Sequence, residues 1–142
     1  MSQSLEEIIN DFRSMSDWED RYKKIIQMGK EGGNLNEDQK SKDNLVNGCQ
    51  SQVWLVANLN DEEKIVFEAD SDALIAKGLV NLLIQIYSNQ TPDEVLHTDT
   101  SFISEIGLDT HLSANRSNGL TAMVKQMKYY ATAYKALLGQ KF

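Results

Sequence analysis

The residue with the clearest capacity for chemistry is Cys49, the one cysteine of the chain, which lies in a polar, glycine-containing stretch at residues 47–52. A free cysteine is most often a small buried residue, and composition alone favours that role by roughly two to one. Its neighbours Gly48 and Gln50 give it no apolar surroundings, and the glycine permits a turn that presents the thiol. The stretch therefore favours an accessible loop thiol. A single cysteine excludes an internal disulfide and a metal site built mainly from thiolates.

A nucleophilic thiol needs a second group to ionise it. A thiol with an ordinary pKa of about 8.5 is only a few per cent thiolate at neutral pH, so it needs a cation, a base or a helix N-terminus beside it. The candidates are the two histidines, His97 and His111, and Arg116, which precedes the last expected helix. Each has an ordinary alternative, because such residues usually lie at the surface or bond a loop. Sequence spacing alone places none of them beside Cys49.

Carboxylates offer a further set of candidates. Asp70 and Asp72 flank a serine ahead of an apolar stretch, a pattern that favours helix capping over acid–base catalysis. A zinc site made of Cys49, His97, His111 and an aspartate lacks the dense ligand pairs that mark such sites. No glycine-rich loop opens a helix after a strand, so nucleotide binding has no support. We expect neither a metal nor a cofactor in this chain.

Composition limits the class of protein. The 142 residues fit a single domain spanning 1–142, and 14 basic against 21 acidic side chains give a formal charge of −7. That charge opposes nucleic acid and anionic membrane surfaces as partners. No window approaches the ~18 apolar residues of a membrane span, and Glu6 and Glu7 stand where a secretory signal is basic or apolar. We expect a cytoplasmic protein.

Helical periodicity predicts two helices before the cysteine. Ser4 with Glu7 and Ser16 with Glu19 form capping-box patterns, and apolar stripes follow at residues 5–12 and 18–29. The second stripe stops near the glycine pair at 32–33. Residues 31–44 are almost wholly polar and predict a surface connection.

A hairpin and more helices are expected after the cysteine. Residues 45–59 and 65–67 are rich in β-formers around a polar turn, which predicts an antiparallel sheet of two or about three strands. Val53 and Leu55 share one face and Trp54 lies on the other, so both faces should be covered, and we expect helices to cover them. The order of elements gives an α+β fold, because consecutive strands lack a crossover helix.

Three helices are expected beyond the hairpin. Ser71 is the expected N-cap of a wide apolar stripe at residues 74–86, which predicts the most buried helix. Thr91 and Pro92, followed by acidic residues, predict the start of a short helix. A last helix is expected from about Asn118, after a mixed segment.

The stretch around the cysteine closely resembles the cysteine loop of SufE-type sulfur acceptor proteins. The residues that carry the resemblance are 44–55, with the sequence NLVNGCQSQVWL. Further matches follow the order of the family, at residues 18–22 (WEDRY), 70–73 (DSDA), 77–79 (KGL), 91–92 (TP) and 116–120 (RSNGL) with Met123. The resemblance extends from about Leu5 to Leu138. One departure is that Lys40 or Lys42 stands about where an arginine is common.

The resemblance implies a sulfur acceptor of iron–sulfur cluster assembly. Cys49 would take sulfur from the persulfide of a PLP-dependent cysteine desulfurase and pass it to an iron–sulfur scaffold complex. Asp72 and Arg116 would match positions near the cysteine or at the partner surface, and His111 precedes the same arginine-containing turn. Such a chain is a carrier that acts with the desulfurase and is not a self-sufficient enzyme, because persulfide transfer needs one accessible thiol on each protein.

Two other functions remain open at this point. The chain would be an allosteric module if it stimulated a desulfurase without carrying sulfur. It would be a thiol hydrolase if Cys49 worked with His111 or His97 as a Cys–His pair.

Overall fold

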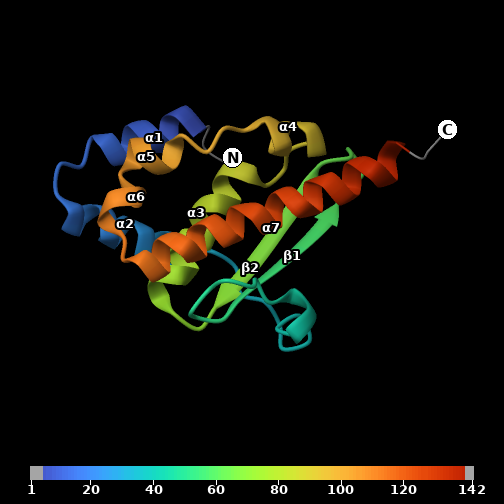
Figure 1. Cartoon of the computed structure of the whole chain (residues 1–142), viewed down its shortest axis with the longest axis horizontal. Helices are drawn as coiled ribbons and strands as arrows, with labels where there is room; N and C mark the ends of the chain where they lie inside the picture. Colours follow the sequence, from blue (N-terminus) through green and yellow to red (C-terminus); the bar gives the residue numbers. More distant parts are fainter. Residues whose placement is uncertain (1–4, 140–142) are drawn as a thin grey trace.

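The computed structural model describes residues 5–139, which form an α+β fold around one buried helix (Figure 1). Its elements are, in order, α1 (Leu5–Arg13), α2 (Trp18–Glu31), the 3-10 turn η1 (Lys42–Asn44), β1 (Val53–Leu59), β2 (Ile65–Ser71), α3 (Leu74–Tyr87), α4 (Pro92–His97), α5 (Phe102–Ile106), α6 (Leu108–His111) and α7 (Ala114–Gly139). The long helix α7 crosses one side of the molecule, and α1 and α2 lie at the end opposite the hairpin tip (Figure 1).

The sheet within residues 5–139 has two strands, the smaller of the two numbers that the sequence allowed. β1 and β2 pair antiparallel, with Val53 opposite Ser71 and Leu59 opposite Ile65. The stretch before β1 contributes a single bridge, between Leu45 and Trp54. Gly48 has a φ of +97°, which lies outside the extended region, so the chain turns there and does not continue a strand.

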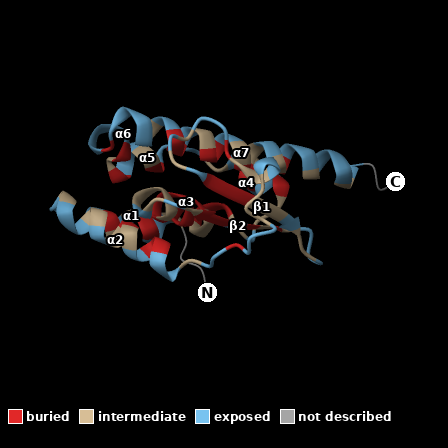
Figure 2. Cartoon of the chain, turned by 90° about the horizontal axis from the view of Figure 1, so that it is seen from below, coloured by how far each residue is buried: buried red, intermediate tan, exposed pale blue. Residues whose placement is uncertain are grey.

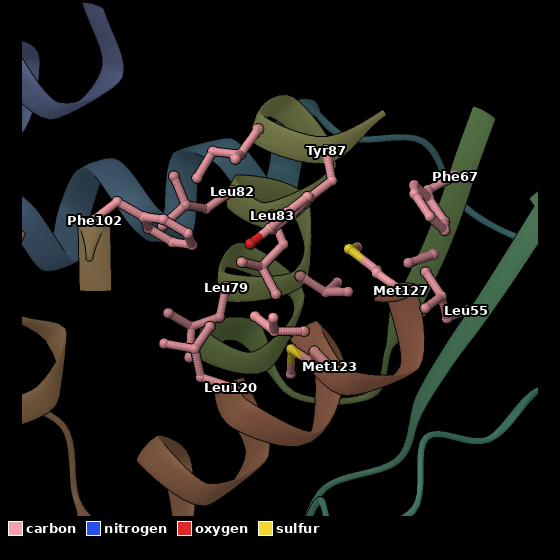
Figure 3. Close-up of a cluster of buried hydrophobic side chains, with 14 of the residues drawn as sticks. Leu55, Phe67, Leu79, Leu82, Leu83, Tyr87, Phe102, Leu120, Met123 and Met127 are labelled. Atoms are coloured by element: carbon pink, nitrogen blue, oxygen red, sulfur yellow. The ribbon is translucent and has the colours of Figure 1, made fainter. Parts of the chain in front are cut away.

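Helix α3 is the most buried helix, as its wide apolar stripe predicts. It packs against α2, α7 and the sheet, and Figure 2 shows buried residues gathered along α3, both strands and the inner side of α7. Side chains from all these elements meet in one cluster, together with Phe102 of α5 (Figure 3). Burial of this much apolar area is the main source of stability, at roughly 25 cal/mol per Å².

The two faces of the sheet are covered differently. Val53 and Leu55 face the helices and are fully buried. Trp54 lies on the other face, where a loop covers it: Leu45 bridges its backbone and the Lys40 ammonium lies 5.8 Å from its ring centre. The expectation of helices on both faces was therefore wrong for this face.

The polar loop on that face is held by Asp70, a buried carboxylate that is 3% exposed. Its oxygens lie 3.4 Å from the ammonium groups of both Lys40 and Lys77, and one accepts the Leu35 amide at 3.1 Å. Asp70 lies opposite Trp54 in the sheet register and therefore on the same face. The segment expected to be a surface connection is thus tied to β2 and α3.

Several helix ends differ from the sequence expectation. The N-cap of α2 is Asp17 and not Ser16, because the Asp17 carboxylate accepts the Glu19 amide at 3.0 Å. The N-cap of α3 is Ala73, which makes no side-chain cap, and α7 begins at Ala114, four residues before the expected start. The capping residue Ser4 lies outside the described residues.

The capping box of the short helix α4 is confirmed. The Thr91 hydroxyl accepts the Glu94 amide at 3.2 Å, and the Glu94 carboxylate accepts the Thr91 amide at 3.0 Å. Local sequence alone determines where α4 begins, because the two residues of the capping box lie within four positions of each other.

Candidate functional site

Cys49 lies in a short loop, residues 47–51, between two fixed points. On one side the Val46 amide donates to the Val53 carbonyl at 2.8 Å. On the other side the Gln52 amide donates to the Asp72 carboxylate at 3.1 Å, and the Ser71 hydroxyl donates to the Gln52 carbonyl at 2.7 Å. We call residues 47–51 the cysteine loop. Its ends are therefore fixed to the sheet while its middle makes no backbone ladder.

The side chain of Cys49 turns inward against α7. Its Sγ lies 3.6 Å from the Gly119 carbonyl, to which it donates, and the residue is half-buried. A Cβ at position 119 would lie 3.5 Å from that sulfur, so glycine leaves the space in which the thiol sits. The positive φ of Gly48 turns the loop so that the Cys49 side chain points toward α7.

Partial burial sets the ionisation of this thiol. Burial raises the pKa of Cys49 above its ordinary value, because an apolar environment disfavours the thiolate. The inward conformation therefore holds Cys49 as a neutral thiol, which is the less reactive form.

Cys49 opens onto a cavity of about 520 Å³, which we call the Cys49 cavity. It lies between the cysteine loop, the start of α3 and the start of α7. Its lining residues are Cys49, Gln50, Ser51, Val53, Ala73, Leu74, Ile75, Ala76, Leu79, Ser113, Asn115, Arg116, Gly119 and Met123. One wall is apolar and the other carries hydroxyl, amide and guanidinium groups.

Arg116 contributes the one charged side chain of this described lining. It is exposed in the first turn of α7, where its amide donates to the Ser113 hydroxyl at 3.3 Å. Its guanidinium makes no ion pair with any residue between 5 and 139. In the inward conformation no described cation lowers the pKa of Cys49. Arg116 is thus placed to bind an anion in the cavity without yet ionising the thiol.

Asp72 holds the loop and does not cap a helix. Its carboxylate accepts the Gln52 amide, and its own amide donates to the Gln52 carbonyl at 3.3 Å. The capping role that the sequence suggested for Asp70 and Asp72 is therefore wrong. Neither aspartate lines the Cys49 cavity.

The structure does not bring the histidines to Cys49. His111 stacks on Trp18 with ring centres 4.1 Å apart, and its carbonyl accepts the Tyr22 hydroxyl at 2.5 Å. His97 ends α4, with Nδ1 2.7 Å from the Asp93 carbonyl. Neither lines the Cys49 cavity, so a Cys–His pair has no geometric support. Within residues 5–139 no three histidine, cysteine or acidic residues gather in a way that could hold a metal ion.

Comparison with known proteins identifies the family of this chain. Residues 6–131 match the SufE family, described as an Fe-S metabolism associated domain. The chain belongs to the SufE family. It is 43% identical over 129 residues to an uncharacterized SufE-like protein of Rhizobium etli, a match that covers 88% of this chain and 87% of that protein. A second SufE-like protein, from Rhizobium meliloti, is 39% identical over 129 residues, which cover 88% of this chain and 92% of that one.

The fold of this SufE-family chain also has a match among solved structures. A hypothetical protein from Thermus thermophilus, solved in solution, superposes with a TM-score of 0.77 over 93% of this chain and 96% of that one. At 18% identity this similarity concerns the fold alone. None of the helices between residues 5 and 139 has the length and apolar character needed to cross a bilayer.

Two features of this candidate site were not found from the sequence. Gly119 matters through its contact with Cys49, which is 70 residues away, and nothing in the local pattern indicates that approach. The apolar wall from α3 was expected only as buried core. The match of residues 116–120 to the family was the one signal that pointed to Gly119.

Proposed function

We propose that this SufE-family chain accepts sulfur on Cys49 from a PLP-dependent cysteine desulfurase and delivers it to an iron–sulfur scaffold complex. The Cys49 thiolate attacks the outer sulfur of the desulfurase persulfide. A new sulfur–sulfur bond forms on Cys49, the bond to the desulfurase cysteine breaks, and that cysteine leaves as a thiolate. Sulfane sulfur is transferred without net oxidation, so neither protein needs a further redox partner.

The observation that carries the proposal is the placement of Cys49, a single thiol turned inward on a short loop with both ends fixed. Cys49 follows the fixed amide of Val46 closely in the chain, so the loop can move the sulfur outward by up to roughly 10 Å while its base stays in place. Such a movement suits a thiol that must enter the pocket of another protein.

The contacts that hold Cys49 inward are weak enough to break on docking. A thiol is a weak donor, and half-burial of one small side chain contributes on the order of 1 kcal/mol. The inward conformation limits oxidation of the free thiol, because a neutral, half-buried sulfur reacts slowly. Contacts with the desulfurase therefore need to contribute only about 1 kcal/mol of binding free energy to favour the outward conformation.

Arg116 supports the same chemistry through its charge. Its unpaired guanidinium lines the cavity with Cys49, and a cation near a sulfur anion favours the ionised form. We expect Arg116→Ala to slow sulfur acceptance while the fold is kept, because this side chain is exposed and makes no described ion pair. Unchanged kinetics in Arg116→Ala would remove Arg116 from the site.

The test is intact-mass analysis of the chain after incubation with a cysteine desulfurase and cysteine, without reductant. We expect a gain of one sulfur atom that is lost on adding a thiol reductant and is absent in Cys49→Ser. A control chain with Cys49→Ser and Thr132→Cys presents a thiol on the exposed side of α7 and should gain no sulfur.

Two results would contradict the proposal. One is binding of the desulfurase without any gain of sulfur on Cys49. The other is full stimulation of desulfurase turnover by Cys49→Ser, which would identify the chain as an allosteric module.

A further inference from the structure

The Cys49 cavity is larger than the storage of one sulfur atom requires. Its volume of about 520 Å³ lies within the range of pockets that bind whole small molecules. Leu79 and Met123 belong to its apolar wall, while Ser113 and Asn115 offer hydrogen-bonding groups. Apolar walls with a few convergent polar groups are typical of small-molecule sites.

The charge of this cavity differs from that of the whole chain. The chain carries a formal charge of −7, but none of the residues described as lining the cavity is acidic. Arg116 is its charged lining residue and has no described ion-pair partner. The carboxylate of Asp72 is not among the lining residues and accepts the Gln52 amide. The cavity therefore favours a small molecule with an anionic group.

We propose that the cavity admits low-molecular-weight persulfides that carry a carboxylate, with their outer sulfur at Cys49 and their carboxylate at Arg116. This inference rests on the proposed role of Cys49 as a sulfur acceptor and names a second class of donor for it. A small persulfide reaches the inward Cys49 through the open cavity. A protein-bound persulfide instead requires the cysteine loop to extend.

The transfer step balances in the same way as transfer from a protein. The Cys49 thiol releases its proton to solvent, and the thiolate attacks the outer sulfur of the small persulfide. The sulfur–sulfur bond of the donor breaks as a new one forms on Cys49. The donor leaves as a small thiolate, which takes up a proton from water.

The experiment compares two donors of nearly equal shape: the persulfide of mercaptopropionate and the persulfide of its uncharged amide. Sulfur on Cys49 is followed by intact mass against time. We expect the carboxylate donor to react about two- to fivefold faster, the ratio expected of one exposed guanidinium–carboxylate pair. Arg116→Ala should abolish this preference, because it slows the carboxylate donor more than the amide donor. Lys125→Ala, which removes a charge from α7 outside the cavity, should keep it.

Equal rates for the two donors in the native chain, or a preference that survives Arg116→Ala, would overturn the inference. A parallel reaction with the desulfurase separates this failure from failure of the proposed function. If sulfur arrives from the desulfurase while the small donors show no preference, only the small-donor proposal is lost. If sulfur arrives from neither kind of donor, both proposals are lost.

Discussion

Substitution of Gly119 tests whether contact with α7 holds Cys49 inward. A Cβ built at position 119 would lie 3.5 Å from the Cys49 sulfur and 3.9 Å from its Cα and Cβ. These are ordinary van der Waals separations, so Gly119→Ala should leave the thiol in place. The branched side chain of Gly119→Val extends about 1.5 Å further from its Cβ and enters the space of the sulfur. It should therefore displace Cys49 outward.

The expected change in Cys49 exposure follows from the free energy of the contacts that the inward thiol loses. Half-burial of a cysteine side chain, together with a weak hydrogen bond to a carbonyl, is worth on the order of 1 kcal/mol. Loss of that energy changes the ratio of outward to inward conformations by about fivefold. Gly119→Ala should raise the free energy of unfolding by up to about 1 kcal/mol, because alanine is the better helix former.

The assay is the rate of Cys49 alkylation by iodoacetamide, measured by intact mass at fixed pH, with urea unfolding as the check on stability. We expect Gly119→Val to react about fivefold faster than the native chain and Gly119→Ala to stay within twofold of it. A natively folded Gly119→Val with the native rate would refute the view that α7 holds the thiol. An equal increase in Gly119→Ala would refute the reasoning from distance.

Three further predictions concern stability, measured by urea unfolding. Gly78→Ala should destabilise by roughly 2–3 kcal/mol, because its Cβ would overlap the Ile25 carbonyl oxygen and lie 2.7 Å from the Ile25 carbonyl carbon, which forces α2 away from α3. Native stability of this variant would contradict this packing. Burial raises the pKa of Asp70, but the hydrogen bonds and lysines around it outweigh burial and leave that pKa below its ordinary value. Its stabilisation is therefore complete above the unfolded pKa of about 3.9 and is lost as the pH falls through the folded pKa. Asp70→Asn should accordingly lower the free energy of unfolding by about 2 kcal/mol at pH ~7, and this loss of stability should become smaller in acid. A loss of stability that does not depend on pH would contradict the role of the Asp70 charge. Tyr87→Phe should keep stability or gain up to about 1 kcal/mol, since the buried Tyr87 hydroxyl has no described hydrogen-bond partner, and a loss above that size would reveal one.

Prediction from sequence succeeded where the deciding contacts are local. The capping box at Thr91 depends on residues within four positions, and the stripe of α3 depends on helical periodicity alone. The extent of the sheet was harder to predict, because β-forming residues lie on both sides of the polar stretch 47–52, at 45–46 and at 53–59, and the pattern does not show whether the first pair forms a strand. The backbone at Gly48, with its positive φ, decides that boundary.

Contacts between distant segments could not be predicted in this way. The sequence shows Asp70 as one of two acidic residues before a helix, but its partners Lys40 and Leu35 come from a loop whose course is set by tertiary packing. Cys49 and Arg116 were both chosen from local pattern. Their place in one cavity depends on how α7 lies against the cysteine loop.

The end of β2 holds both the loop that covers the sheet and the loop that carries the cysteine. Asp70, on the outer face of the sheet, holds Lys40 and the Leu35 amide, while Asp72, just beyond the strand, holds the Gln52 amide. In the proposed outward movement of residues 47–51, the hydrogen bonds at both ends of the cysteine loop stay in place, and the contact to be released is the weak one between Cys49 and α7. Since that contact is worth on the order of 1 kcal/mol, against the roughly 5–15 kcal/mol of a typical domain, the thiol can move outward without unfolding its base.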